Sequence, residues 1–171
     1  MSHPTYTISK NDRRNEALLY AANAVLELGK KSYAFTTSNK YKGQKDYIIE
    51  RIIGTLYDRQ KKVLFLDYET SNIANDKIQL TNQQACDMAV LHHASPDAVQ
   101  VFLEKHALDY DFIIFNLPPV KVAAMSVAYA KLCECTLLIE RYGYSNYQAY
   151  EDTLLSFKQH GICIGGVITY E

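Results

Sequence analysis

The stretch Tyr110-Asp-Phe-Ile-Ile-Phe-Asn-Leu-Pro-Pro-Val120 contains a short, almost continuously apolar run that ends at a polar residue and a pair of prolines. Similar β-prone runs lie at 32–37, 62–67, 136–140 and 162–169. Short runs that are apolar throughout are typical of strands in a parallel sheet that is covered on both faces. The sequence therefore predicts an α/β fold, in which a mostly parallel, doubly wound sheet lies between two layers of helices.

Helical periodicity separates these runs. It predicts helices over residues 12–29, 46–60, 82–92, 96–107, 121–133 and 145–160. The apolar stripe of the first helix consists of Leu18, Leu19, Ala22, Val25 and Leu26, and Gly29 is expected to end that helix. Parallel sheets of this kind bind ligands at the carboxyl ends of their strands. The loops after residues 37, 67, 116 and 140 are therefore expected to share one edge, which is the candidate site.

Composition limits the kinds of function. The 171 residues suit one domain spanning 1–171, and their 18 basic and 19 acidic side chains give a formal net charge of −1. This balance argues against nucleic-acid binding and against attraction to anionic lipid. No apolar run approaches the roughly 20 residues that span a bilayer. The segment Met1-Ser-His-Pro-Thr5 has no signal-peptide character, so we expect a cytoplasmic location, or association with a membrane through a partner.

The cysteines Cys86, Cys133, Cys135 and Cys163 lie in apolar or helical surroundings. We expect them to be free, buried thiols in a reducing compartment. The two thiolates of Cys133-Glu-Cys135 lack the further ligands that a zinc site needs. The rings of His92-His93 would point in different directions. The sequence therefore gives no support for a metal site at these residues.

Two later segments carry a specific resemblance. One is Tyr110-Asp, an apolar run and Pro118-Pro-Val120; the other is Cys133-Glu-Cys-Thr-Leu-Leu-Ile-Glu-Arg-Tyr-Gly-Tyr-Ser145. In this order they resemble the bacterial tyrosine kinases of capsular and exopolysaccharide synthesis, which are P-loop proteins related to the MinD and ParA ATPases. The segment Lys61-Lys-Val-Leu-Phe-Leu-Asp-Tyr-Glu69 is similar to a third motif of that family. The resemblance extends from about Glu16 to Thr169 and implies a P-loop NTPase-like three-layer sandwich.

The phosphate loop departs from the family. Its counterpart here is Phe35-Thr-Thr-Ser-Asn-Lys-Tyr-Lys-Gly-Gln-Lys-Asp46, which lacks the Gly-Lys-Ser/Thr core. Aligned on Gly43, Gln44 takes the lysine position, and Lys45 and Asp46 take the hydroxyl positions. A one-residue shift puts Lys45 in the lysine role, but Asp46 then replaces the hydroxyl that binds Mg²⁺ and Gln44 replaces a glycine. Neither alignment restores the N–H groups, lysine and hydroxyl that hold the phosphates and the metal.

The resemblance also implies the other site residues. Asn116 stands where the family has an Asp near Mg²⁺, Asp67 is kept, and Glu69 stands where the family has another Asp. If nucleotide binding is retained, the resemblance assigns Mg²⁺ to Asp67 and ATP to Lys42, Gly43, Gln44, Lys45, Asp46 and Arg141. The alternative is that Asp67 and Glu69 are ordinary polar residues at a strand end.

Two regulatory features of the family are not matched. Its N-terminal helix carries Glu-x-x-Arg-x-x-Arg for ring assembly, whereas Glu16 is followed by Leu19 and Ala22, which suit the core face of a helix. Family members also end in a tyrosine cluster. Here the tyrosines gather at Tyr142, Tyr144, Tyr147 and Tyr150, and packing is their expected role.

These departures favour a degenerate, non-catalytic protein with a regulatory or scaffolding role in capsular or exopolysaccharide biosynthesis. Its partner would be a membrane chain-length regulator or an active paralogue, and a homo-oligomer stays open. The alternative is an active ATP-binding tyrosine kinase or ATPase, in which Lys40, Lys42 and Lys45 supply positive charge. A third reading is a binding module for another anionic ligand at the same edge.

Overall fold

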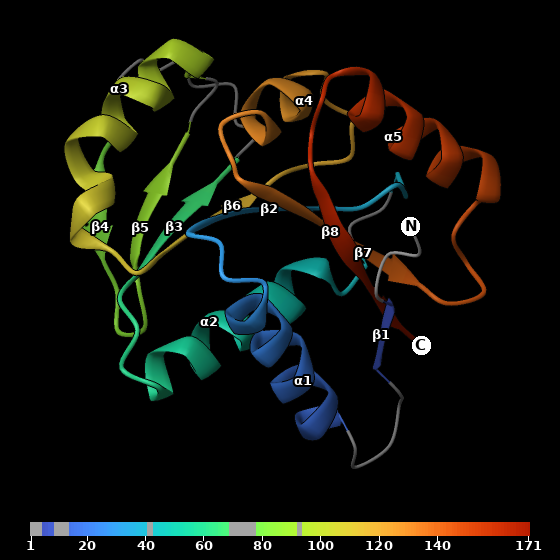
Figure 1. Cartoon of the computed structure of the whole chain (residues 1–171), viewed down its shortest axis with the longest axis horizontal. Coiled ribbons are helices and arrows are strands. Elements are labelled where there is room, and N and C mark those ends of the chain that lie inside the picture. The colour runs from blue at the N-terminus through green and yellow to red at the C-terminus, as the bar shows by residue number, and fades with distance from the viewer. Residues whose placement is uncertain (1–4, 9–13, 41–42, 69–77, 92–93) are drawn as a thin grey trace.

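The computed structural model describes residues 5–8, 14–40, 43–68, 78–91 and 94–171. In these ranges eight strands form one sheet in the order β1-β8-β7-β2-β6-β3-β5-β4 (Figure 1). The strands are β1 (Thr5–Ile8), β2 (Ser32–Thr36), β3 (Val63–Asp67), β4 (Leu80–Asn82), β5 (Asp87–Val90), β6 (Phe112–Asn116), β7 (Cys135–Arg141) and β8 (Ile164–Tyr170). Every neighbouring pair is parallel except β4 and β5. The predicted mostly parallel sheet is confirmed.

Helices cover both faces of this sheet. The α-helices are α1 (Arg14–Glu27), α2 (Lys45–Asp58), α3 (Pro96–His106), α4 (Met125–Ala130) and α5 (Tyr147–Gln159), and a short 3₁₀ helix, η1 (Ala107–Asp109), follows α3. Helices α1 and α2 pack on one face, and α3, α4 and α5 pack on the other (Figure 1). The three-layer arrangement expected from the apolar strands is therefore the one observed.

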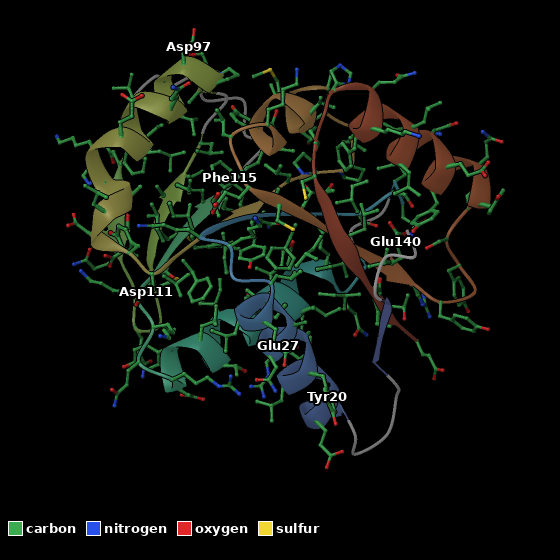
Figure 2. All side chains as sticks on the ribbon, viewed as in Figure 1. Tyr20, Glu27, Asp97, Asp111, Phe115 and Glu140 are labelled. Carbon is green, nitrogen blue, oxygen red and sulfur yellow. The ribbon has the colours of Figure 1, made fainter. Side chains whose placement is uncertain are left out.

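Two hydrophobic cores hold the layers together, one on each side of the sheet. Helix α2 contributes a row of aliphatic side chains at the spacing of a helix face, and all of them are buried: Ile48, Ile49, Ile52, Ile53 and Leu56. Phe115 of β6 lies in the opposite core, near the centre of the molecule (Figure 2). Full burial of each such side chain contributes roughly 1.5–3 kcal/mol. This packing fixes where the ends of the strands lie.

The helix predicted over 82–92 is wrong. Asn82 instead ends β4, and residues 83–90 form a turn and β5, which pairs in parallel with β3 and in antiparallel with β4. The turn is closed by the Gln83 N–H, which donates to the Cys86 carbonyl at 2.9 Å. Ala85, Met88 and Ala89 suit a helix by composition alone. Pairing with the open edge of β3 supplies backbone hydrogen bonds that override this weak local preference. The pair His92-His93 lies outside the described residues.

The first helix is confirmed, with one error in its predicted core face. Gly29 ends it with a φ of +62°, a left-handed conformation that favours glycine. Leu18, Ala22 and Val25 are buried, but Leu19 is 43% exposed. The buried face instead includes Ala21 and so lies further around the helix axis. Tyr20 is exposed as well and points away from the sheet (Figure 2).

Two further expectations are corrected. The helix predicted over 121–133 is only six residues long, Met125–Ala130, and turns precede and follow it. The four cysteines are free, as expected, but only Cys135 is buried: Cys86 and Cys133 are half-buried, and Cys163, which directly precedes β8, is exposed. None of the helices in the described ranges has the length and apolar character that a membrane crossing needs.

Candidate functional site

The carboxyl ends of β2, β3, β6 and β7 meet at one edge of the sheet. Asn116 lies beside Asp67 in the β3–β6 register and beside Phe35 in the β2–β6 register. The loop after β2 crosses this edge and enters α2 at Lys45. The structure therefore brings Lys45, Asp67 and Asn116 together, although they are far apart in the sequence.

Lys45 is the most deeply buried charged residue of this edge, with 1% of its surface exposed. Its Nζ donates to Asn116 Oδ1 and, at 2.9 Å, to the carbonyl oxygen of Leu117. Asp46 Oδ1 lies 3.6 Å from the same ammonium group. A buried ammonium is costly unless it is paired and hydrogen-bonded, and these contacts meet both conditions. Its donors therefore point inward to the ends of the strands.

Asn116 connects this lysine to two carboxylates. Its Nδ2 donates to Asp46 Oδ1 at 3.0 Å and to Asp67 Oδ1 at 2.8 Å, while its Oδ1 accepts from Lys45. The opposite amide orientation would set Oδ1 against two carboxylates, so the network itself determines the assignment. An amide is the one side-chain group of this shape that can accept from a cation and donate to two anions.

These contacts bear on whether Mg²⁺ and a nucleotide fit this edge. Magnesium in nucleotide sites takes one or two carboxylates together with phosphates and waters, at about 2.0–2.1 Å. Here the cation beside Asp46 is the Lys45 ammonium, and Asp67 accepts from the Asn116 amide. Neither the loop nor Asn116 supplies the family's hydroxyl or second carboxylate. The described residues therefore do not fit a magnesium–nucleotide site.

Gly43 lies directly against Tyr170, near the end of β8. It has a φ of +55°, and a Cβ built there would lie 1.9 Å from the Tyr170 hydroxyl oxygen. That oxygen accepts a hydrogen bond from the backbone N–H of Gln44 at 3.2 Å. In a working phosphate loop, backbone N–H groups of this segment bind phosphate oxygens. Here a side chain of the protein takes one of them.

Glu140, at the end of β7, is a buried acid that was not singled out from the sequence. Its carboxylate accepts from the Ser38 N–H at 2.6 Å, from Asn39 Nδ2 at 3.1 Å and from the Ser145 hydroxyl at 2.8 Å. Figure 2 marks it near the end of β7, below α5. Burial raises the pKa of Glu140, and the hydrogen bond from the Ser38 N–H opposes that shift. The signal was a charged residue within the apolar run that forms β7.

A small cavity lies beside the Lys45 network. Its volume is about 90 Å³, and its described lining consists of Lys40, Lys45, Tyr68, Asn116, Pro118, Pro119 and Val122. A water molecule takes up about 30 Å³ of liquid volume, whereas ligand pockets usually measure about 300–1,000 Å³. This cavity therefore has room for a few waters or one small ion.

The other predicted site residues are not joined to this network by the observed contacts. The guanidinium of Arg141 stacks on the Tyr144 ring, 3.7 Å from the ring centroid. Lys42 and Glu69 lie outside the described residues. The nucleotide-binding roles of Gly43, Gln44, Lys45, Asp46 and Arg141 stay predictions that depend on whether a nucleotide binds.

The packing role predicted for the tyrosines is wrong for three of them. Tyr142, Tyr144 and Tyr147 are 69%, 69% and 72% exposed. Tyr150 is partly buried and packs against the hydrophobic core between the sheet and helices α3, α4 and α5. Tyr142 and Tyr144 lie in the turn at Gly143, whose φ is +73°, and Tyr147 is the first residue of α5. An aromatic surface therefore lies next to the candidate site.

Comparison with known proteins supports the fold. The chain is similar to the chimerical protein CapA2B2, with a TM-score of 0.80 and 13% identity over 98% of this chain and 94% of that one. It is also similar to the kinase domain of the Escherichia coli tyrosine kinase ETK, with a TM-score of 0.76 and 16% identity over 98% and 90% of the two chains. The MinD cell division protein of Aquifex aeolicus matches with a TM-score of 0.61 and 13% identity over 82% and 68%.

No family model matches the sequence, and no curated protein matches it. At these identities the structural likeness shows a shared fold. It agrees with the resemblance that the sequence motifs carry, and the P-loop NTPase-like architecture is confirmed. The protein therefore has the fold of the bacterial tyrosine kinase domains and of MinD.

Proposed function

We propose that this protein is a non-catalytic relative of the bacterial tyrosine kinases, which acts by binding a protein partner. The single observation that carries the proposal is the sequestered state of Lys45. Its ammonium is buried and bonded to Asn116 and Leu117. A lysine that serves phosphoryl transfer must instead reach the β- and γ-phosphates.

Two other features support the proposal. One backbone N–H group of the loop is taken by the Tyr170 hydroxyl and another by the Glu140 carboxylate. Phosphoryl transfer depends almost entirely on positioning and on preorganised charge. Loss of the lysine, the hydroxyl and the second carboxylate together would reduce the rate by orders of magnitude.

Nucleotide binding is the direct test. ATP and ADP are titrated into the protein by calorimetry, with and without Mg²⁺. We expect no heat of binding at high micromolar nucleotide. The matched variants are Lys45→Ala and Lys131→Ala, since Lys131 is an exposed lysine at the end of α4. Micromolar, magnesium-dependent binding that Lys45→Ala abolishes and Lys131→Ala retains would overturn the proposal and favour an active kinase or ATPase.

The partner is proposed from the sequence resemblance together with the aromatic surface of Tyr142, Tyr144 and Tyr147. Tyrosine and arginine are enriched among residues that dominate binding energy, and Arg141 lies against Tyr144. We propose that the partner belongs to capsular or exopolysaccharide synthesis, as a membrane chain-length regulator or an active paralogue.

This part is tested by binding to the purified cytoplasmic segment of such a regulator, and separately to the active kinase. The variant in which Tyr142, Tyr144 and Tyr147 are changed to Ser should lose binding. The control Tyr20→Ser removes an equally exposed tyrosine from α1, on another surface, and should retain it. Equal binding by both variants would place the interface elsewhere. Binding to neither purified protein would refute the assignment to this pathway.

A further inference from the structure

Two of the four cysteines lie opposite each other on adjacent strands. Cys135 is the first residue of β7, and Cys163 directly precedes β8. The register pairs Thr136 with Ile164, and the Thr136 N–H donates to the Cys163 carbonyl at 2.8 Å. One residue back in this parallel register, Cys135 and Cys163 are neighbours. Residues paired in this way point to the same face of a sheet.

The spacing suits a covalent bond between the two sulfurs. Neighbouring strands lie about 4.7–4.9 Å apart, and disulfides join Cα atoms that are about 4.4–6.8 Å apart. Besides burial, the nearby Cys163 thiol raises the pKa of Cys135, which is consistent with two side chains lying side by side. Gly165 leaves the room that the Cys135 sulfur occupies, since a Cβ built there would lie 2.2 Å from that sulfur.

The two thiols differ in access. Cys163 is exposed, whereas Cys135 is buried beneath α1 and α2. Burial raises the pKa of Cys135 to about 11, so this thiol is a poor target for an oxidant in solution. Cys133 donates to the Tyr129 carbonyl, and Cys86 lies next to β5, on the other side of the sheet's centre. An oxidant therefore meets Cys163 first, and Cys135 is the thiol beside it.

We propose that Cys163 and Cys135 form a peroxide-sensitive thiol pair. The Cys163 thiol attacks one oxygen of hydrogen peroxide; the O–O bond breaks, and a sulfenic acid and one water are formed. The Cys135 thiol then attacks the Cys163 sulfur, which releases the hydroxyl group as a second water and leaves a disulfide. Two electrons pass from the sulfurs to the peroxide. The bond ties the beginning of β7 to the beginning of β8, at the edge of the sheet opposite the candidate nucleotide site.

The experiment uses the folded chain. The protein is treated with hydrogen peroxide, the peroxide is removed, and the chain is then denatured and alkylated with N-ethylmaleimide before intact-mass measurement. We expect a monomer with two adducts fewer than the untreated protein and a Cys135–Cys163 peptide in the digest. In Cys135→Ser, dimedone should trap a sulfenic acid at Cys163. The control Cys86→Ser should still lose two adducts, whereas Cys163→Ser should lose none.

Three results would overturn the proposal. In the first, the treated wild-type protein keeps all four alkylatable thiols. In the second, Cys163 is oxidised to a sulfinic acid while Cys135 remains alkylatable. In the third, Cys163 is linked to a second copy of the chain. Because Cys163 is exposed, Cys163→Ser is expected to fold, so the test does not depend on the buried Cys135 variant alone.

Discussion

Asn116→Asp is the sharpest test of the network at the strand ends. It restores the carboxylate that the resembling kinases have at this position and keeps the shape of the side chain. It also removes the N–H group that donates to Asp46 at 3.0 Å and to Asp67 at 2.8 Å. Three carboxylates would then surround one ammonium. We therefore expect the variant to be less stable than the wild-type protein at neutral pH.

The magnitude follows from the two lost hydrogen bonds. A hydrogen bond to a charged group contributes roughly 1.5–3 kcal/mol. The side chain of Asp46 is 44% exposed, so its share is discounted for solvent screening. A stronger attraction to Lys45 offsets a further part. The remaining loss is about 2–3 kcal/mol, which at roughly 2–4 °C per kcal/mol for a chain of this size lowers Tm by about 4–12 °C.

The deficit should depend on pH. While it is ionised, the introduced carboxyl repels Asp46 and Asp67, and once protonated it can donate a hydrogen bond again. The destabilisation should therefore be smaller at pH 5 than at pH 8. Urea unfolding at pH 8 and at pH 5 measures both stabilities.

The control is Asn146→Asp. Asn146 caps α5 by accepting from the Ala149 N–H at 3.2 Å, and Asp accepts there equally well. This variant should match the wild-type stability. An Asn116→Asp protein as stable as the wild type at pH 8 would refute the reasoning, because the amide would then not be needed as a donor between Asp46 and Asp67.

Three further predictions concern the loop, the buried acid and a helix start. Gly43→Ala should lower the free energy of unfolding by about 1–2 kcal/mol because of its φ of +55° alone. The new Cβ would also lie 1.9 Å from the Tyr170 hydroxyl oxygen, which adds a further loss. In a double-mutant cycle measured by urea unfolding, Tyr170→Phe should recover part of that further loss. Burial raises the pKa of Glu140, so the wild-type protein gains stability from this group as pH falls through its pKa in the folded chain. In Glu140→Gln this part of the pH dependence of the urea midpoint should vanish. Ser95→Ala removes the cap that accepts from the Ala98 N–H at 3.1 Å, and calorimetry should show a Tm lower by about 2–4 °C.

The central strands and the long helices could be predicted because their residues leave little choice. The β6 run is apolar from Phe112 to Phe115 and ends at Asn116 and two prolines, and no helix pattern fits it. Helix α2 has five aliphatic residues at the spacing of one face. In both cases the local pattern and the tertiary packing agree.

The hairpin of β4 and β5 could not be predicted in this way. The pairing partner of Met88 is Phe65 on β3, more than 20 positions earlier in the sequence. The composition of residues 82–92 alone gives no information about that pairing. The same limit applies to Glu140. Its charge within an apolar strand was visible, but its donors Ser38 and Asn39 come from the loop after β2. The helical spacing of Tyr147 and Tyr150 predicts that both pack, but Tyr147 is the first residue of α5 and is exposed.

The departures from the nucleotide-binding pattern depend on one another. Asp46, in place of a hydroxyl, puts a carboxylate beside the strand ends, and Asn116, in place of a carboxylate, supplies the N–H group that this carboxylate accepts. Lys45 then lies between them with its charge matched. Restoring the Asp at 116 alone adds repulsion, and restoring the hydroxyl at 46 alone removes the carboxylate that lies 3.6 Å from the Lys45 ammonium. Because the contacts are shared, the first single reversal toward the kinase pattern should lower stability before any phosphate site can be rebuilt.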